Sequence, residues 1–96
     1  MDMMKVSKIC KALGDYNRLQ IIKMLAREEL CACQILEEFN ITQPTLSHHM
    51  QVLSECDLIY SKKDGKWTHY TLNYETINEY KEFINCLVSS SHEYIS

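Results

Sequence analysis

Cys31 and Cys33, two thiols separated by one residue, are the side chains whose type and spacing most clearly suggest chemistry in this sequence. The chain has five cysteines in 96 residues, and an odd count in a protein expected in the reducing cytoplasm does not favour a disulfide scaffold. Thiolates bind soft metal and metalloid ions, and they also oxidise reversibly. We therefore expect metal binding or redox chemistry at these thiols, with no constitutive cofactor.

Enzymatic catalysis is not suggested by the remaining residues. No serine, histidine and aspartate set and no carboxylate pair has a spacing typical of catalysis. The Cys-x-Cys spacing also differs from the Cys-x-x-Cys spacing of thioredoxin-like enzymes. The sequence therefore predicts a protein that is not an enzyme.

The segment that holds the two thiols, residues 30–39, has a helical pattern of apolar residues. Residues i and i+2 of an ideal helix point about 200° apart. In contrast, metal–sulfur bonds of about 2.3 Å hold neighbouring sulfur atoms within roughly 4 Å of each other. We therefore expect that an ion bound by both thiols distorts the first helical turn, and this distortion is our hypothesis for a switch.

Two earlier helices are predicted from apolar periodicity and capping residues. The first spans residues 3–13, and Gly14 follows it. The second is capped by Asp15. Its predicted apolar stripe is Leu19, Ile22 and Leu25.

A helix predicted over residues 43 to about 56 has an outward face suited to DNA. Thr42 is its expected N-cap, and Pro44 is tolerated in its first turn. Hydroxyl, amide and imidazole groups can bond base edges or phosphates, whereas His49 is expected to be a structural histidine. The predicted DNA-contacting residues of this helix are Gln43, Thr45, Ser47, His48 and Gln51.

An Asp-Gly pair between two β-rich runs predicts a β-hairpin over about residues 58–72. Strand alternation would place Leu58, Tyr60, Tyr70 and Leu72 on similar faces. The tip is the most basic part of the chain, and its lysines are expected to neutralise DNA phosphates without reading the base sequence. These lysines are Lys62, Lys63 and Lys66.

A last helix is predicted over about residues 75–94. Its apolar side and that of the helix at about 2–13 are left over once the other elements form a core, and such faces usually dimerise. The predicted fold is mainly α with a small β-hairpin: a dimeric winged helix-turn-helix of about five helices and a two-stranded antiparallel wing. It forms a single domain over residues 1–96, with the helix-turn-helix at about 30–56 and the wing at about 58–72.

Composition and charge further restrict where the protein is expected to act and how it could bind DNA. No signal peptide and no stretch of 18 apolar residues is recognisable, so we expect a cytoplasmic protein without a membrane partner. The formal net charge is −3, which disfavours nucleic-acid binding driven by overall charge. Any DNA contact must depend on local patches.

Several stretches together resemble the ArsR/SmtB family of metal-responsive repressors over about residues 8–72. They are ALGD at 12–15, RL at 18–19, ELCAC at 29–33 and TQPTLSHHMQVL at 42–53. The resemblance implies a homodimer that binds double-stranded DNA at an inverted-repeat operator and represses a resistance or efflux operon.

The resemblance also implies that Cys31 and Cys33 sense a thiophilic ion such as arsenite, antimonite, cadmium, lead or zinc. Arsenic-sensing members often have a third cysteine three residues after the second, but here this position is Leu36. Another branch supplies further thiols from the N-terminal region, sometimes of the opposite subunit, which makes Cys10 a candidate third ligand. Two alternatives stay open: the thiols sense an oxidant, or the chain is a family member that senses no metal.

Overall fold

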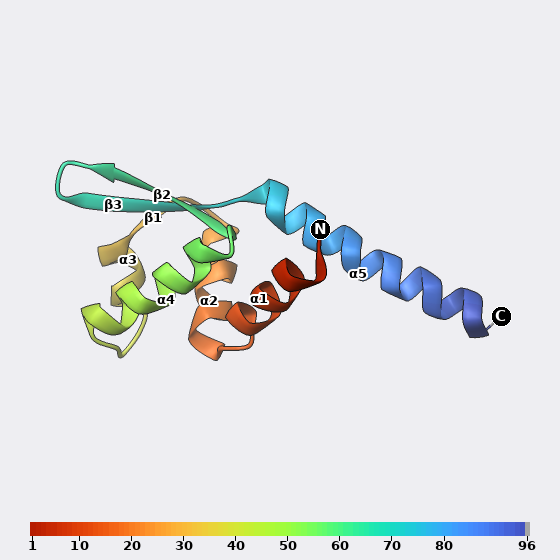
Figure 1. The fold of residues 1–96 in the computed structure, drawn as a ribbon. Coiled ribbons are helices and arrows are strands. Elements are labelled where there is room, and N and C mark those ends of the chain that lie inside the picture. Colours follow the sequence, from red (N-terminus) through yellow and green to blue (C-terminus); the bar gives the residue numbers. More distant parts are fainter. Residues whose placement is uncertain (96) are drawn as a thin grey trace.

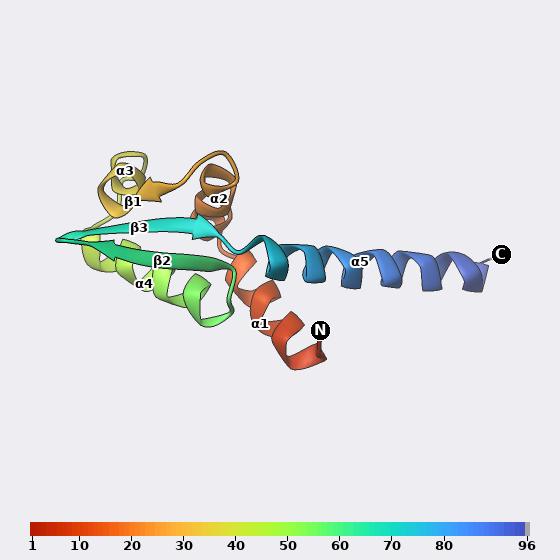
Figure 2. The ribbon, with the colours of Figure 1, turned by 90° about the horizontal axis from the view of Figure 1, so that it is seen from above.

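The computed structural model describes the backbone of residues 1–95 and the side chains of residues 1–89. Helices α2, α3 and α4 pack against a small sheet, α1 packs against α2 and α4, and α5 extends away from them (Figures 1 and 2). A short turn between α3 and α4, followed by a β-hairpin, gives the predicted winged helix-turn-helix. The elements are α1 (Met3–Leu13), α2 (Tyr16–Leu25), β1 (Leu30–Cys31), α3 (Ala32–Glu37), α4 (Gln43–Glu55), β2 (Ile59–Asp64), β3 (Trp67–Leu72) and α5 (Tyr74–Ile95).

Side-chain caps determine where three of the helices begin. Asp2, Asp15 and Thr42 each accept a hydrogen bond from a backbone N–H three residues later, at the starts of α1, α2 and α4. Such caps satisfy amides that have no partner within the helix. Pro44 lies in the first turn of α4, where its missing N–H costs no helical hydrogen bond. The predicted capping by Asp15 and Thr42 is confirmed.

The buried face of α2 differs from the predicted stripe. Ile21 and Leu25, one helical turn apart, are buried. Leu19 is exposed, and Ile22 is only partly buried. The prediction for Leu19 is therefore wrong, because the apolar residues of α2 fit two different helical stripes and packing against the other elements selects one.

The segment predicted to be helical over residues 30–39 is divided between two elements. Leu30 and Cys31 form strand β1, with Cys31 opposite His69 of β3. Helix α3 is shorter than predicted, and Cys31 is its N-cap residue, with extended backbone angles of φ −86° and ψ 161°. Pairing with a strand almost 40 positions away overrides the local helical pattern.

The sheet contains three antiparallel strands in the order β1–β3–β2. The prediction of a two-stranded wing was incomplete, since β1 adds a short third strand. The hairpin itself is confirmed, and Gly65 at its tip has a φ of 64°, a left-handed conformation that glycine adopts without steric cost.

The register of β2 corrects one predicted face. Ile59 lies opposite Leu72 and both are buried, whereas Tyr60 lies opposite Thr71 and is exposed. Tyr60 therefore does not share the inner face with Leu72 and Tyr70. A shift of one residue in where a strand begins moves every side chain to the other face.

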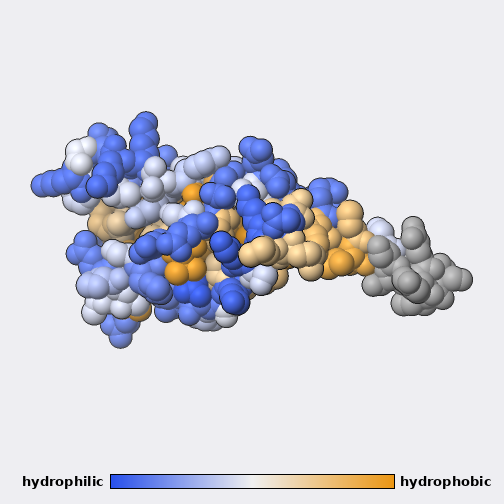
Figure 3. Space-filling model, viewed as in Figure 1, coloured by the Kyte–Doolittle hydropathy of each residue, from blue (hydrophilic) through white to orange (hydrophobic). Residues whose placement is uncertain are grey.

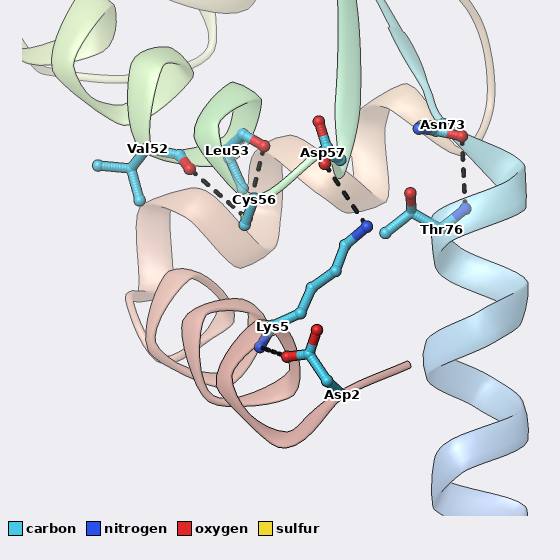
Figure 4. Close-up of polar contacts among 8 residues, drawn as sticks. All are labelled: Asp2, Lys5, Val52, Leu53, Cys56, Asp57, Asn73 and Thr76. Carbon is cyan, nitrogen blue, oxygen red and sulfur yellow. Dashed lines mark hydrogen bonds and ion pairs between the residues drawn. The ribbon is translucent and has the colours of Figure 1, made fainter.

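One ion pair links α1 to the turn that follows α4 (Figure 4). Lys5 Nζ lies 3.5 Å from Asp57 Oδ2, and Asp57 has a φ of 60° in this turn. Nearby, the Asn73 side chain accepts a hydrogen bond from the backbone N–H of Thr76 and so caps α5.

The apolar core lies between the helices and the sheet. Its largest fully buried side chains are Ile9, Ile21, Leu25, Ile35, Leu46, Leu53 and Leu58.

Helix α5 projects from this body with an apolar surface along part of its length (Figure 3). The molecule is elongated, with extents of 54 × 24 × 24 Å. Ile84, Leu87 and Val88 are 40%, 50% and 63% exposed. Among the residues described, no helix combines the length and apolar content that crossing a membrane would require.

Candidate thiol site and nucleic-acid interface

Cys31 and Cys33 lie side by side at the start of α3. Both are free cysteines, and their Sγ atoms are 2.6 Å apart. The two sulfur atoms meet because Cys31 has an extended backbone and precedes the helix. The expectation that both thiols can reach one ion only by distorting a helix is therefore wrong.

The two thiols differ in their pKa. The hydrogen bond from Cys33 lowers the pKa of the Cys31 thiol, and the backbone N–H of Gln34 acts in the same direction. The same contact raises the pKa of Cys33. The Gln34 side chain also accepts a hydrogen bond of 2.8 Å from the Cys31 N–H, which fixes the backbone at this corner. Cys31 is thus the thiol that ionises first.

Cys10 makes a different contact within the folded chain. Its Sγ lies 3.5 Å from the hydroxyl of Tyr80, between α1 and α5. Across the part of the chain that the structure describes, no three side chains of histidine, cysteine, aspartate or glutamate form a group that could hold a metal ion. A single chain therefore brings together the two predicted ligands Cys31 and Cys33, and it does not bring Cys10 to them.

A cleft of about 330 Å³ opens beside Cys33, between α3, α4 and β3. Its walls include Leu36 of α3, Met50 of α4, and Trp67 and Tyr70 of β3. The aromatic residues were missed by sequence reasoning because no spacing rule relates β3 to a helix more than 30 positions earlier. Three predicted DNA-contacting residues also line the cleft: Gln43, Ser47 and Lys66.

The residues of α4 that were predicted to contact DNA are all exposed: Gln43, Thr45, Ser47, His48 and Gln51. Two of them make contacts within the chain. The Thr45 hydroxyl lies 3.0 Å from Thr42 Oγ1, and the Gln51 amide donates a hydrogen bond of 3.1 Å to Glu55. The others leave an outward face of polar and imidazole groups near the start of α4.

The basic residues of the hairpin lie at or near its tip. Lys62 and Lys63 are exposed on β2, and Lys66 is exposed beside the turn. Lys66 Nζ lies 5.7 Å from the centre of the Trp67 ring, within the range of a cation–π contact. Their positions suit contact with a phosphate backbone.

His49 is buried on the inner side of α4, where it forms part of a polar network. Arg18 Nη1 lies 3.2 Å from His49 Nδ1, and Arg18 Nε donates a hydrogen bond of 2.7 Å to the carbonyl of Ala12. Burial lowers the pKa of His49, and Arg18 adds to this effect, whereas Asp15 opposes it. The network connects the corner between α1 and α2 to the middle of α4, a role of Arg18 that the sequence alone did not reveal.

The sequence matches the family profile described as "Bacterial regulatory protein, arsR family" over residues 15–61. An arsenical resistance operon repressor of Staphylococcus aureus is 40% identical over 91% of this chain and 84% of its own length. The repressor of the same name in Staphylococcus xylosus is 44% identical, over 84% of this chain and 81% of its own length. A cadmium resistance transcriptional regulatory protein CadC homolog of Staphylococcus aureus is 34% identical, over 82% of this chain and 66% of its own length.

Solved structures share the fold. An ArsR-like transcriptional regulator from Rhodococcus sp. RHA1 has a TM-score of 0.85 over 96% of this chain and 87% of its own, at 18% identity. A homodimeric winged helix-turn-helix DNA-binding domain from Mycobacterium bovis has a TM-score of 0.73 over 94% of this chain and 82% of its own, at 23% identity. These structures confirm the winged helix-turn-helix fold.

Proposed function

Since this chain belongs to the arsR family of bacterial regulatory proteins, we propose that it is released from its operator by a thiophilic ion bound at Cys31 and Cys33. The family consists of transcriptional regulators, not enzymes. The observation that carries the proposal is the 2.6 Å separation of the two Sγ atoms beside the helix-turn-helix. Relatives named for arsenical and cadmium resistance support arsenite or cadmium as the effector. Antimonite, lead and zinc are further candidates because thiolates bind them as well.

The cleft beside Cys33 offers a route from the bound ion to DNA. An ion with metal–sulfur bonds of about 2.3 Å separates two sulfur atoms to almost 4 Å, so its binding must move Cys33 away from Cys31. Because Cys33 borders the cleft formed with α4 and β3, this movement changes the packing beneath both DNA-facing elements. Linkage then requires that DNA weakens ion binding by the same factor.

The proposed DNA complex contains two copies of the chain on an inverted repeat. The α4 residues proposed to contact bases or phosphates are Gln43, Thr45, Ser47, His48 and Gln51, and the wing contributes Lys62, Lys63 and Lys66. The exposed apolar residues of α5 are proposed to form the dimer together with α1. The homodimeric Mycobacterium bovis domain of the same fold supports this assembly.

Two thiolates leave the coordination of most thiophilic ions incomplete. Cys10 remains the proposed third ligand, and it would come from the second subunit because its own chain places it beside Tyr80. A ligand from outside the protein is the alternative. Cys10→Ser distinguishes them: loss of ion affinity with unchanged operator affinity supports the cysteine.

The test uses reduced protein and an operator selected from random DNA by the protein itself. Arsenite, cadmium and zinc are titrated while thiolate–metal absorbance and DNA release are followed together. Cys31→Ser and Cys33→Ser should bind the operator and fail to release it, whereas the matched control Cys86→Ser should behave as the unmodified chain. Release of both serine variants at the wild-type ion concentration would refute the proposal.

A second candidate is an oxidant sensor, which the adjacent sulfur atoms and the lowered pKa of Cys31 favour. A peroxide would oxidise the Cys31 thiolate to a sulfenic acid, and the Cys33 thiol would then displace its hydroxyl as water to form a disulfide. Peroxide would release DNA from metal-free protein, and a dithiol reductant would restore binding. Release by arsenite under reducing conditions, with no effect of peroxide, would exclude this candidate, and no effect of either would indicate a member that senses neither.

A further inference from the structure

We propose that the cleft between α3, α4 and β3 is a second effector site, which binds a small aromatic carboxylate and competes directly with operator DNA. The ligand is held by non-covalent contacts alone, so it acts on reduced protein without any ion. This inference rests on the DNA contacts proposed above and does not depend on ion binding at the thiols.

The cleft has the size and the walls of a small-molecule site. Its volume of about 330 Å³ lies at the lower end of the range of such sites. Leu46 and Met50, each 2% exposed, line it from α4. Trp67 and Tyr70 line it from β3, and Trp67 is 50% exposed, so much of its ring is free to contact a ligand. Because aromatic pairs gain more than area burial alone, these walls favour a ligand with an aromatic ring.

The charge of the lining indicates which polar group the ligand carries. Among the described residues that line the cleft, Lys66 is the one charged side chain, and none is an aspartate or a glutamate. The chain as a whole has 13 acidic and 10 basic residues, and the groove between α2 and α3 is lined by three glutamates. Gln43, Ser47 and Thr68 add neutral hydrogen-bond donors to the cleft. A carboxylate is the group that an ammonium and such donors bind best.

The position of these donors makes competition with DNA the expected effect. Gln43 and Ser47 of α4 and Lys66 of the wing are proposed DNA contacts, and all three line the cleft. A carboxylate bound to them takes the place of the phosphates or bases that they would contact. Linkage then requires that bound operator weakens ligand binding by the same factor.

The first experiment uses the reduced, full-length chain without DNA or added ions. The probes are para-trifluoromethylbenzoate and its neutral amide, which share one ring and nearly one shape. Fluorine NMR line widths and the fluorescence of Trp67, the single tryptophan, report binding. The carboxylate should change the Trp67 emission and should bind about fivefold or more tightly than the amide, which is the gain from a charge-assisted hydrogen bond.

Four variants locate the bound probe. Lys66→Gln should remove the preference for the carboxylate over the amide. The matched control is Lys63→Gln, the same change on β2 at a side chain that does not line the cleft, and it should keep the preference. Thr68→Phe fills the cleft from β3, and Leu36→Gln makes its wall polar. Each of these two should weaken both probes by about tenfold, because the ring is no longer buried against apolar walls.

The second experiment adds operator DNA. The carboxylate should raise the apparent Kd of the operator once its concentration exceeds its own Kd, and sodium acetate at equal concentration controls for ionic strength. Thr68→Phe should bind the operator and lose this response. Cys31→Ser should keep it, because Cys31 does not line the cleft, although this variant should no longer respond to arsenite or cadmium.

Three results would overturn the inference. If operator DNA changes the Trp67 emission and the carboxylate does not, the cleft belongs to the DNA interface alone. Equal probe binding by Thr68→Phe and by the unmodified chain would place the probe elsewhere, and binding without release of the operator would exclude competition. Ion-induced release is measured separately, so its failure with an intact carboxylate response would refute the proposed ion sensing and leave this inference supported.

Discussion

At the scale of single residues, Cys31 and Cys33 differ because they share one hydrogen bond. The Cys33 thiol stabilises the Cys31 thiolate, which lowers the pKa of Cys31 and raises that of Cys33. The two groups therefore lose their protons in two steps that belong to the pair. The proposed binding of an ion by both thiolates would therefore have to release the more tightly held proton of Cys33.

The first prediction concerns this shared proton. Cys33→Ala removes the hydrogen bond that is the main cause of the lowered pKa of Cys31, so the pKa of Cys31 should rise toward that of an ordinary thiol. The ultraviolet absorbance of the thiolate, followed against pH, measures the shift. The same titration of Cys86→Ala, which alters an exposed cysteine of α5, should keep the low-pH step. An unchanged first step in Cys33→Ala would show that the start of α3 alone determines the ionisation of Cys31.

At the scale of elements, local signals predicted the helices better than the sheet. Asp15 and Thr42 fix helix starts through bonds to amides three residues away, which a sequence pattern can show. In contrast, Cys31 leaves the helical pattern because β1 pairs with β3, a contact between distant segments. The sequence therefore predicted the wrong geometry for the thiol pair, whose role in ion binding stays a prediction.

The cleft beside Cys33 depends even more on contacts between distant segments, which a sequence pattern does not reveal. Cys33 and Leu36 were recognised within one short segment, but Trp67 and Tyr70 join them only when β3 folds against α3 and α4. Periodicity indicates which side of a strand is apolar, and it does not indicate which helix covers that side. The sequence therefore indicated two neighbouring thiols as a candidate site, whereas it did not indicate the shape of the cleft beside them.

The second prediction concerns the attachment of α4 through His49. Burial lowers its pKa in the folded state, so below its unfolded pKa of about 6.5 the unfolded chain binds the proton more tightly. The contribution of neutral His49 to the free energy of unfolding should therefore be fully present above about pH 6.5. This contribution should be lost as the pH decreases through the lower, folded pKa. Asp15, Arg18 and His48 are the charged or titratable groups that affect His49.

Chemical denaturation of the unmodified chain and of His49→Gln across this pH range measures the effect. The variant should be less stable at neutral pH, and its stability should depend less steeply on pH below 6.5. The exposed neighbour provides the control, since His48→Gln should retain the slope. Equal slopes in the unmodified chain and in His49→Gln would assign the pH dependence to another group.

The third prediction concerns the wing. Replacing Lys62, Lys63 and Lys66 with glutamine should weaken operator binding and should lower the slope of log affinity against log salt by about 3 per subunit, since each phosphate contact contributes about 0.9. Fluorescence anisotropy at several salt concentrations measures the slope. Lys23→Gln, at an exposed position of α2, should leave it nearly unchanged. A triple variant with the original slope would place the wing away from the phosphates.

At the scale of the whole molecule, the shape and the charge both favour a paired protein. With a net charge of −3, one copy has little long-range attraction for DNA, and two copies on one operator double the number of local contacts. Helix α5, which would be about 33 Å long at 1.5 Å per residue, projects beyond the core (Figure 2). Among the described residues, it exposes the apolar side chains of Ile84, Leu87 and Val88, and Figure 3 shows an apolar surface along this part of the molecule. These side chains are the part of the molecule that a second copy would cover.

The last prediction tests this assembly with a charge on the exposed side of α5. Leu87→Lys places an ammonium group where the dimer would bury an apolar one, and an unpaired buried charge is strongly unfavourable. The variant should be monomeric in analytical ultracentrifugation and should keep its helical content. Its operator affinity should fall by about a hundredfold or more, because two linked binding modules gain at least this factor from effective concentration.

The matched control is Glu82→Lys, on the same helix but about 140° around its axis from Leu87. This change adds even more positive charge, so it should keep the dimer and should not weaken operator binding. The contrast separates loss of the interface from a general effect of charge. If Leu87→Lys remains dimeric with full operator affinity, the exposed apolar side of α5 is not the interface, and α1 alone would have to supply it.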